Sequence, residues 1–159
     1  MCIHPTFTEM KLLIVLVSVF IVSCASLWLV SKKIDYALAG RIAMAAMLML
    51  TSFGHFKFAP GMEMMLPEFV PFKREVVYAT GIFEILAAIG LLINPTYRLT
   101  GILLIVFFVL ILPSNILASL KEINIEKGTL DGPGLGYLWF RIPLQLFFIG
   151  WIYRAAVAN

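Results

Sequence analysis

The stretch Glu75–Ile93, which reads EVVYATGIFEILAAIGLLI, decides the fold. As a helix it has the length that crosses the hydrocarbon core of a bilayer, about 20 residues. Glu84 interrupts it near its middle. Because an ionised side chain is costly in hydrocarbon, such a residue usually faces the interior of a helix bundle and marks a polar site. The stretch therefore predicts a transmembrane helix with one polar position turned toward neighbouring helices.

The composition extends this prediction to the whole chain. Of its 159 residues, 62% are hydrophobic and 13% are charged. Soluble domains are about half apolar and about a quarter charged, so we expect an integral membrane protein in contact with the lipid bilayer. The net charge of +3 is small and scattered along the sequence, which argues against a nucleic-acid partner.

Five apolar segments have the length of a membrane-spanning helix. They cover residues 11–30, 37–58, 75–93, 97–120 and 136–156. They are too long and too continuous for the alternating strands of a barrel, so the predicted fold class is an all-α membrane protein. We divide it into an N-terminal transmembrane helix with a short linker, residues 1–36, and a four-helix membrane domain, residues 37–159.

The first segment has two interpretations. Ile21-Val22-Ser23-Cys24 resembles a bacterial lipoprotein processing site after a short basic start. However, the apolar run continues to Val30, whereas the apolar core of a cleaved signal is shorter. The pattern favours an uncleaved span over a signal peptide and leaves both interpretations open.

The connections indicate which helix ends lie together. Asn94-Pro95-Thr96 is a short turn, so the third and fourth spans should be antiparallel neighbours. Prolines between residues 60 and 71 predict an irregular or interfacial loop. The end of the second span, the start of the third, the end of the fourth and the start of the fifth then lie at one membrane face.

Five polar side chains come to a similar depth below this face. At a rise of 1.5 Å per residue, they lie roughly 5 to 14 Å below the membrane surface. They are Glu84, Arg141, Asn115, Gln145 and His55. This convergence within one leaflet predicts an intramembrane ligand-binding cluster.

The members of the cluster have alternative roles. Arg141 is the predicted partner of Glu84, and the pair either belongs to a binding site or only fixes the register of the helices. Asn115 and Gln145 either contact a ligand or join helices by hydrogen bonds. His55 is either part of the site or a simple interfacial residue.

Small residues flank Glu84 on its own helix. Thr80, Gly81, Ala87 and Ala88 lie three or four positions away, so another helix can approach this face closely. Arg41, near a helix end, is predicted to extend toward the lipid head groups.

Motifs for catalysis or cofactor binding are not found. Cys2 and Cys24 form no CxxC pattern, and His4 and His55 have no ligand spacing around them. A Gly-rich phosphate loop and a GxSxG motif are both missing from the sequence. The sequence therefore predicts no catalytic residue, no metal site and no cofactor, and it does not decide whether the protein is an enzyme.

Four motifs resemble the DoxX-like family of small bacterial membrane proteins. The resemblance covers about residues 37–156, and its pieces are Gly54-His55-Phe56 with Met64-Met65-Leu66-Pro67, Tyr78-Ala79-Thr80-Gly81-Ile82-Phe83-Glu84-Ile85, Leu112-Pro113-Ser114-Asn115-Ile116, and Leu138-Trp139-Phe140-Arg141-Ile142-Pro143-Leu144-Gln145. The resemblance implies a four-helix membrane bundle in the bacterial cytoplasmic membrane and a link to quinone-like compounds. The chain departs from the family pattern by its additional first span.

These observations favour three functional hypotheses. In the first, the protein binds a small amphipathic ligand, such as a quinone or an isoprenoid-like lipid, in the polar pocket. In the second, it is the membrane subunit of a quinone-linked oxidoreductase and receives electrons through a redox partner protein. In the third, it is a structural or assembly protein without a ligand.

Overall fold

A computed structural model describes the backbone of residues 7–158 and the side chains from Met10 onward, apart from that of Tyr137. The described chain is helical, and its two-residue bridge between Asn124 and Thr129 is not part of a strand. The helices are α1 (Phe7–Ser31), α2 (Tyr36–Lys57), α3 (Ala59–Met64), α4 (Lys73–Leu92), α5 (Tyr97–Leu120), α6 (Gly136–Ile152) and the π-helix η1 (Tyr153–Val157). The predicted all-α fold class is confirmed.

Four of these helices, α1, α2, α4 and α5, are long and apolar enough to cross a membrane. This indicates a multi-pass integral membrane protein. Helix α6 has 17 residues, which gives a length of about 26 Å, slightly below the thickness of the hydrocarbon core. The π-helix η1 follows it directly and continues the helical backbone to Val157. A fifth crossing at this position stays a prediction.

The helix boundaries follow from local side-chain chemistry. Asp35 caps α2, because its carboxylate accepts a hydrogen bond of 2.9 Å from the Leu38 N–H, and such a cap satisfies one of the free donors at a helix start. Between α4 and α5, the Thr96 hydroxyl bonds to the carbonyl oxygens of Gly90 and Ile93. This turn makes α4 and α5 antiparallel neighbours, as predicted.

The short helix α3 was not predicted. Residues 60–71 were expected to form an irregular or interfacial loop, but Ala59–Met64 is helical. Pro60 lies at the start of α3, where its fixed φ angle suits a helix and its missing N–H is not needed. The remaining residues, 65–72, form the loop to α4.

Helix α2 forms the centre of the bundle and packs most extensively against α4 and α1. Seven large side chains are fully buried: Leu16, Met44, Met47, Leu48, Leu91, Leu104 and Ile152. On α4, the small residues Gly81, Ala87 and Ala88 are buried, which confirms the close-packing face. A Cβ at Gly81 would lie only 2.9 Å from the His55 Cβ.

The outer surfaces of the helices are apolar. On α4, Ile82, Leu86 and Ile89 are each more than half exposed. A soluble protein rarely exposes such a continuous apolar face, whereas a helix in a bilayer turns it toward the lipid chains. The buried and exposed faces of α4 therefore agree with a membrane-spanning position.

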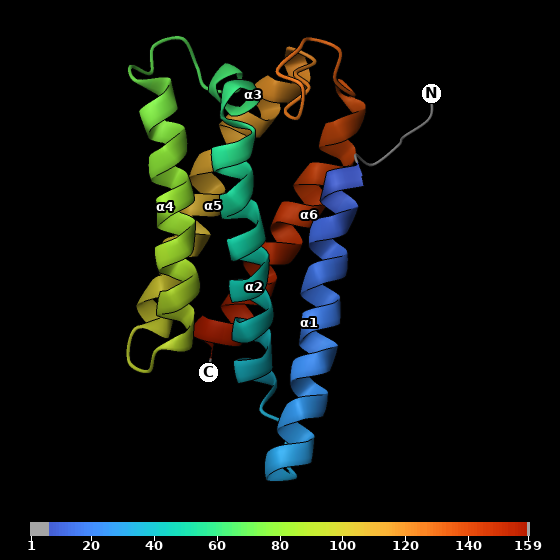
Figure 1. Ribbon diagram of the computed structural model, residues 1–159, viewed down its shortest axis with the longest axis vertical. Coiled ribbons are helices and arrows are strands. Elements are labelled where there is room, and N and C mark those ends of the chain that lie inside the picture. Colours follow the sequence, from blue (N-terminus) through green and yellow to red (C-terminus); the bar gives the residue numbers. More distant parts are fainter. Residues whose placement is uncertain (1–6, 159) are drawn as a thin grey trace.

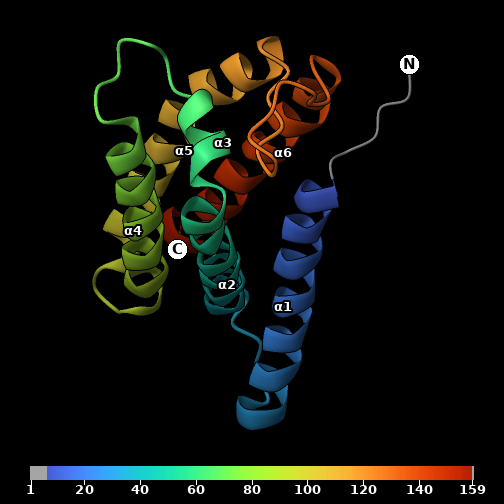
Figure 2. The same cartoon turned by 45° about the horizontal axis from the view of Figure 1, so that its top comes forward.

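Helix α1 lies along α2 at the edge of the bundle (Figures 1 and 2). It contributes Leu12 and Leu16 to the core, and Phe20 packs edge-to-face on Trp151 with ring centres 5.0 Å apart. The helix runs without interruption through Cys24.

One end of the molecule carries the elements that enclose the site. The end of α2, all of α3, the start of α4, the end of α5, the start of α6 and the loop at residues 121–135 gather there (Figure 1). The α4–α5 turn and the described C-terminus lie at the opposite end. The arrangement confirms the predicted grouping of helix ends at one face.

Arg41 differs from its predicted position. Its side chain does not extend outward: the residue is 8% exposed, and its guanidinium carbon lies 4.0 Å from the centre of the Tyr97 ring. A cation at this distance over an aromatic face is attracted by the ring quadrupole. The prediction that Arg41 extends toward the head groups is therefore wrong, because the Tyr97 ring at the start of α5 provides an aromatic surface for it.

Candidate functional site

A cavity of about 840 Å³ opens between the helices near the end that carries α3. Its volume lies in the range of small-molecule binding sites, roughly 300 to 1,000 Å³. The five residues predicted to form the site, His55, Glu84, Asn115, Arg141 and Gln145, all line it. They come from α2, α4, α5 and α6, so the helix bundle brings together side chains that are far apart in the sequence.

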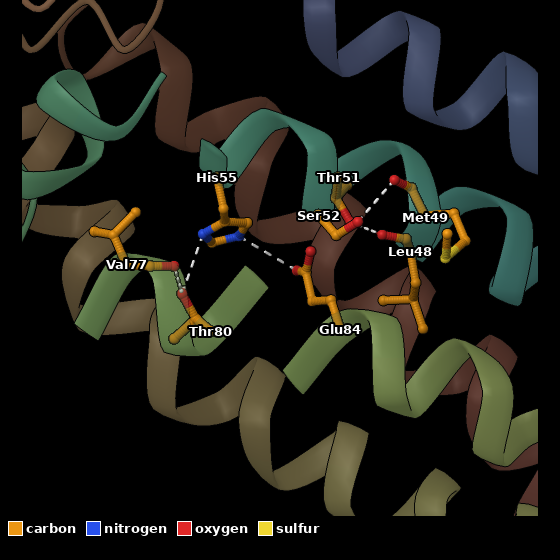
Figure 3. A network of polar contacts seen from close by, with 8 residues as sticks. All are labelled: Leu48, Met49, Thr51, Ser52, His55, Val77, Thr80 and Glu84. Carbon is orange, nitrogen blue, oxygen red and sulfur yellow. Dashed lines mark hydrogen bonds and ion pairs between the residues drawn. The ribbon is translucent and has the colours of Figure 1, made fainter. Parts of the chain in front are cut away.

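Glu84 and His55 face each other across the α2–α4 interface (Figure 3). The His55 Nε2 lies 3.5 Å from Glu84 Oε1, and the two side chains are 18% and 6% exposed. On the other side of the imidazole ring, Nδ1 lies 3.1 Å from the hydroxyl oxygen of Thr80. His55 is therefore held between two side chains of α4, and it lines the cavity.

The predicted partner of Glu84 was Arg141. The ion pair that the described residues give Glu84 is instead with His55. Gly81 has no side chain, so α2 can approach α4 closely at this position. The imidazole of His55 then lies next to the carboxyl group of Glu84. Arg141 lines the same cavity from α6. The structure therefore brings Arg141 to the predicted cluster, and the ion pair of Glu84 is with His55.

Asn115 and Gln145 form a second polar pair across the α5–α6 interface. The Asn115 side-chain amide donates a hydrogen bond of 3.1 Å to Gln145 Oε1. Gln145 Nε2 in turn donates to the main-chain carbonyl oxygen of Phe108. Both residues are buried. This pair joins the two helices, and the same side chains border the cavity.

Apolar side chains form much of the remaining cavity wall. They include Leu48, Phe108, Ile111, Leu144 and Phe148. A cavity with a few polar groups at one side and apolar groups around them suits a ligand with a polar head and an apolar body.

The loop at residues 121–135 borders the cavity at the α3 end. Ile123 packs with Met65 and Ala118, and the carbonyl oxygen of Ile125 lies directly against Gly61. Within the loop, the Thr129 hydroxyl donates a hydrogen bond to Asp131. This bond lowers the pKa of the Asp131 carboxyl, and the nearby Lys127 ammonium acts in the same direction. Asp131 is therefore an anion at the cavity border at neutral pH.

Sequence reasoning missed the polar role of Thr80. The residue was interpreted only as a small neighbour of Glu84. Its hydroxyl is the group that positions the His55 ring, and it lies one helical turn before Glu84 on the same face of α4. That spacing of four residues was the available signal, because residues four apart on a helix are neighbours.

The site contains acid, imidazole, hydroxyl and amide groups. Among the described residues, no three His, Cys, Asp or Glu side chains are grouped so that they could hold a metal ion. The arrangement can bind a polar group by hydrogen bonds.

A family model described as "Domain of unknown function (DUF8561)" matches residues 44–156. The chain belongs to this family. The matched DUF8561 region starts within α2 and ends within η1, and it contains the five site residues together with Thr80. The comparison with curated proteins found no significant match, and neither did the comparison with solved structures. All of α1 and the start of α2 lie outside the DUF8561 match.

Proposed function

We propose that this protein binds a small amphipathic ligand, such as a quinone or an isoprenoid-like lipid, within the membrane. The observation that supports this proposal is the cavity, which has polar groups from four helices on its wall and apolar side chains around them. A ligand of this class enters from the bilayer with its apolar body and places its head group at the polar wall.

The depth of the polar groups supports an amphipathic ligand over a water-soluble one. His55 and Glu84 lie on helices that are long and apolar enough to cross a membrane. A polar group inside a bilayer needs a partner, because water is scarce there. A ligand head group between α2, α4, α5 and α6 provides such a partner, while its tail replaces lipid chains.

The test is whether a small lipid remains with the purified protein. Protein purified in mild detergent is analysed by native mass spectrometry, and its extract is compared with the total lipid of the host membrane. We expect one enriched amphiphile with the unchanged protein. Ser114 lines the cavity, so Ser114→Phe fills part of it and should remove most of the bound ligand.

The matched control is Val106→Phe on the same helix. Val106 is 49% exposed on the outer surface of α5, so a phenyl ring there meets lipid and should leave ligand retention unchanged. If no species is enriched with the unchanged protein, or if S114F retains the ligand as well as V106F does, the cavity is not a binding site.

A second, more specific proposal concerns the wider family of this protein and the membrane in which it lies. The four sequence motifs support kinship with the DoxX-like family, a place in the bacterial cytoplasmic membrane, and a quinone-linked oxidoreductase complex as an alternative role. In that role, electrons reach the quinone through a partner protein. An absorbance spectrum of the purified complex and a quinone-reduction assay test it, and a complex without a cofactor-bearing partner and without turnover excludes it.

A further inference from the structure

We infer that the ligand of this cavity presents a neutral hydroxyl group, as an alcohol or a phenol, to Glu84. This inference rests on the proposed function and narrows it to ligands whose head group donates a hydrogen bond. It follows from the directions of the hydrogen bonds around His55 and from the charges along the cavity wall.

The hydroxyl of Thr80 has one proton and two neighbours. Its oxygen lies 2.7 Å from the Val77 carbonyl oxygen and 3.1 Å from His55 Nδ1 (Figure 3). A carbonyl oxygen can only accept, and it is the nearer neighbour, so the hydroxyl donates to Val77. His55 Nδ1 therefore carries a hydrogen and donates it to the Thr80 oxygen.

Because Nδ1 carries a hydrogen, the role of the second ring nitrogen, Nε2, depends on its contact with Glu84. His55 Nε2 faces Glu84 Oε1 at 3.5 Å. Where a proton bridges this contact, either an imidazolium donates to a carboxylate, or a neutral imidazole accepts from a carboxylic acid. In both states one proton lies between Nε2 and Oε1. The second oxygen of the carboxyl group, Oε2, is then an acceptor in both states.

Glu84 Oε2 has no hydrogen-bond partner among the described residues and is enclosed by protein atoms. Buried polar atoms without a partner are uncommon in native proteins. Glu84 borders the cavity, and the terminal torsion of a glutamate side chain is soft. A small rotation therefore brings Oε2 to a donor on a bound ligand. Ethers, esters and ketones, including oxidised quinones, cannot serve because they only accept, whereas the hydroxyl groups of a reduced quinol can donate.

The charges around the cavity argue against a cationic donor. Among the described lining residues outside the His55–Glu84 pair, Lys11, Lys57 and Arg141 are cationic, and Glu126 and Asp131 are anionic. The pair itself adds no net charge in either of its two states. An ammonium head group would meet a surplus of positive charge along this wall. A hydroxyl supplies the donor without that repulsion.

The test compares two probes that differ only in the donor. The full chain in lipid nanodiscs is exposed to equal amounts of farnesol, an isoprenoid alcohol, and farnesyl methyl ether. Bound probe is quantified by mass spectrometry and divided by the amount in empty nanodiscs, which removes differences in partition into lipid. We expect the alcohol to be enriched about tenfold over the ether, the factor for one hydrogen bond to a charged or buried acceptor.

Two variants test whether Glu84 causes the preference for the alcohol over the ether. Glu84→Gln should reduce the ratio to below about threefold, since the amide can donate to the ether oxygen. Glu75→Gln, the same change at an exposed position of α4, should keep the ratio of the unchanged protein.

The outcomes separate this inference from the proposed function. Equal enrichment of the two probes overturns the hydroxyl inference and leaves amphiphile binding intact. No enrichment of either probe overturns the hydroxyl inference for isoprenoid alcohols, whereas the proposed function is overturned only if no species is enriched with the purified protein. A tenfold preference that persists in E84Q shows that another residue receives the hydroxyl, and it overturns the role of Glu84.

Discussion

His55 Nε2 on α2 lies 3.5 Å from Glu84 Oε1 on α4, and the other ring nitrogen, Nδ1, contacts the hydroxyl group of Thr80. The contact joins the two helices that pack most extensively in the molecule. A polar pair at such an interface can serve stability, ligand binding or both, and the two roles have different consequences for single and double substitutions.

We predict that His55→Leu and Glu84→Leu each destabilise the protein by about 1–3 kcal/mol, because either change leaves the other polar group buried without its partner. The double variant H55L/E84L should recover most of this loss, since two apolar side chains pack where the pair was. Reversible unfolding in mixed micelles, followed by circular dichroism, gives the free energies of unfolding and the coupling between the two sites.

The same double variant should not retain the ligand. If H55L/E84L is as stable as the unchanged protein and still retains the amphiphile, the pair has only a structural role. If it is less stable than either single variant, the pair does not behave as a buried polar contact at all.

A second prediction concerns the close approach of α2 and α4. Gly81→Ala places a Cβ 2.9 Å from the His55 Cβ, so the helices must move apart by a few tenths of an ångström. We expect a loss of about 1–3 kcal/mol, the usual cost of an added methyl group in a well-packed interface, and weaker ligand retention. Thermal unfolding in detergent measures the first effect, and mass spectrometry of the extract measures the second.

Gly150→Ala is the matched control for this change. Position 150 lies in α6 and has no atom within 4 Å of an added Cβ, so alanine should be neutral or stabilise the helix by up to about 1 kcal/mol. Equal losses of stability in G81A and G150A would contradict the close-packed interface.

Most helices of the fold could be predicted from the sequence. The segment at residues 97–120 was predicted with its observed ends, and the segment at 37–58 differs from α2 by one residue at each end. These boundaries were readable because long apolar runs end at prolines, charges and turn residues. Helix α3 was missed because its six residues are too few for a periodic pattern.

The candidate site was only partly readable from sequence. Counting residues from a helix end gives the depth of a side chain in the membrane, and all five predicted residues do line one cavity. Depth does not give the direction in which a side chain points around the helix axis. His55 and Arg141 were both at suitable depths for Glu84, and only the packing of α2 against α4 selects His55.

A third prediction concerns the loop that borders the cavity. A Cβ at Gly61 would overlap the main-chain carbonyl of Ile125. Because a backbone atom cannot move aside as a flexible side chain can, Gly61→Ala should displace the loop at residues 121–135 from α3. We expect trypsin to cut at Lys121 and Lys127 about tenfold faster, which corresponds to a loss of about 1.4 kcal/mol in local stability.

Gly54→Ala controls for the general effect of removing a glycine near the site. An added Cβ there has its nearest neighbours at 3.8 and 3.9 Å, which is ordinary contact. Its cleavage rate should match that of the unchanged protein. An unchanged rate in G61A would show that the loop does not depend on its contact with α3.

The last prediction concerns the sidedness of the loops. Lys121 Nζ lies 3.9 Å from Glu68 Oε1, so the loop after α5 and the loop before α4 meet at one end of the molecule. Lys33 follows α1 at the other end, because the single helix α2 separates it from α3. In a variant with Cys2 and Cys24 replaced by serine, we introduce Glu68→Cys, Lys127→Cys or Lys33→Cys. A membrane-impermeant maleimide is then added to sealed cells or vesicles.

We expect E68C and K127C to label from the same side of the membrane and K33C only from the opposite side. Labelling after the membrane is opened with detergent is the control, since all three positions should then react. If K33C and K127C were labelled from the same side of intact membranes, α2, α4 and α5 would not all cross the bilayer. The cavity could then not be formed by helix ends that share one leaflet, and the site would have to lie outside the hydrocarbon core.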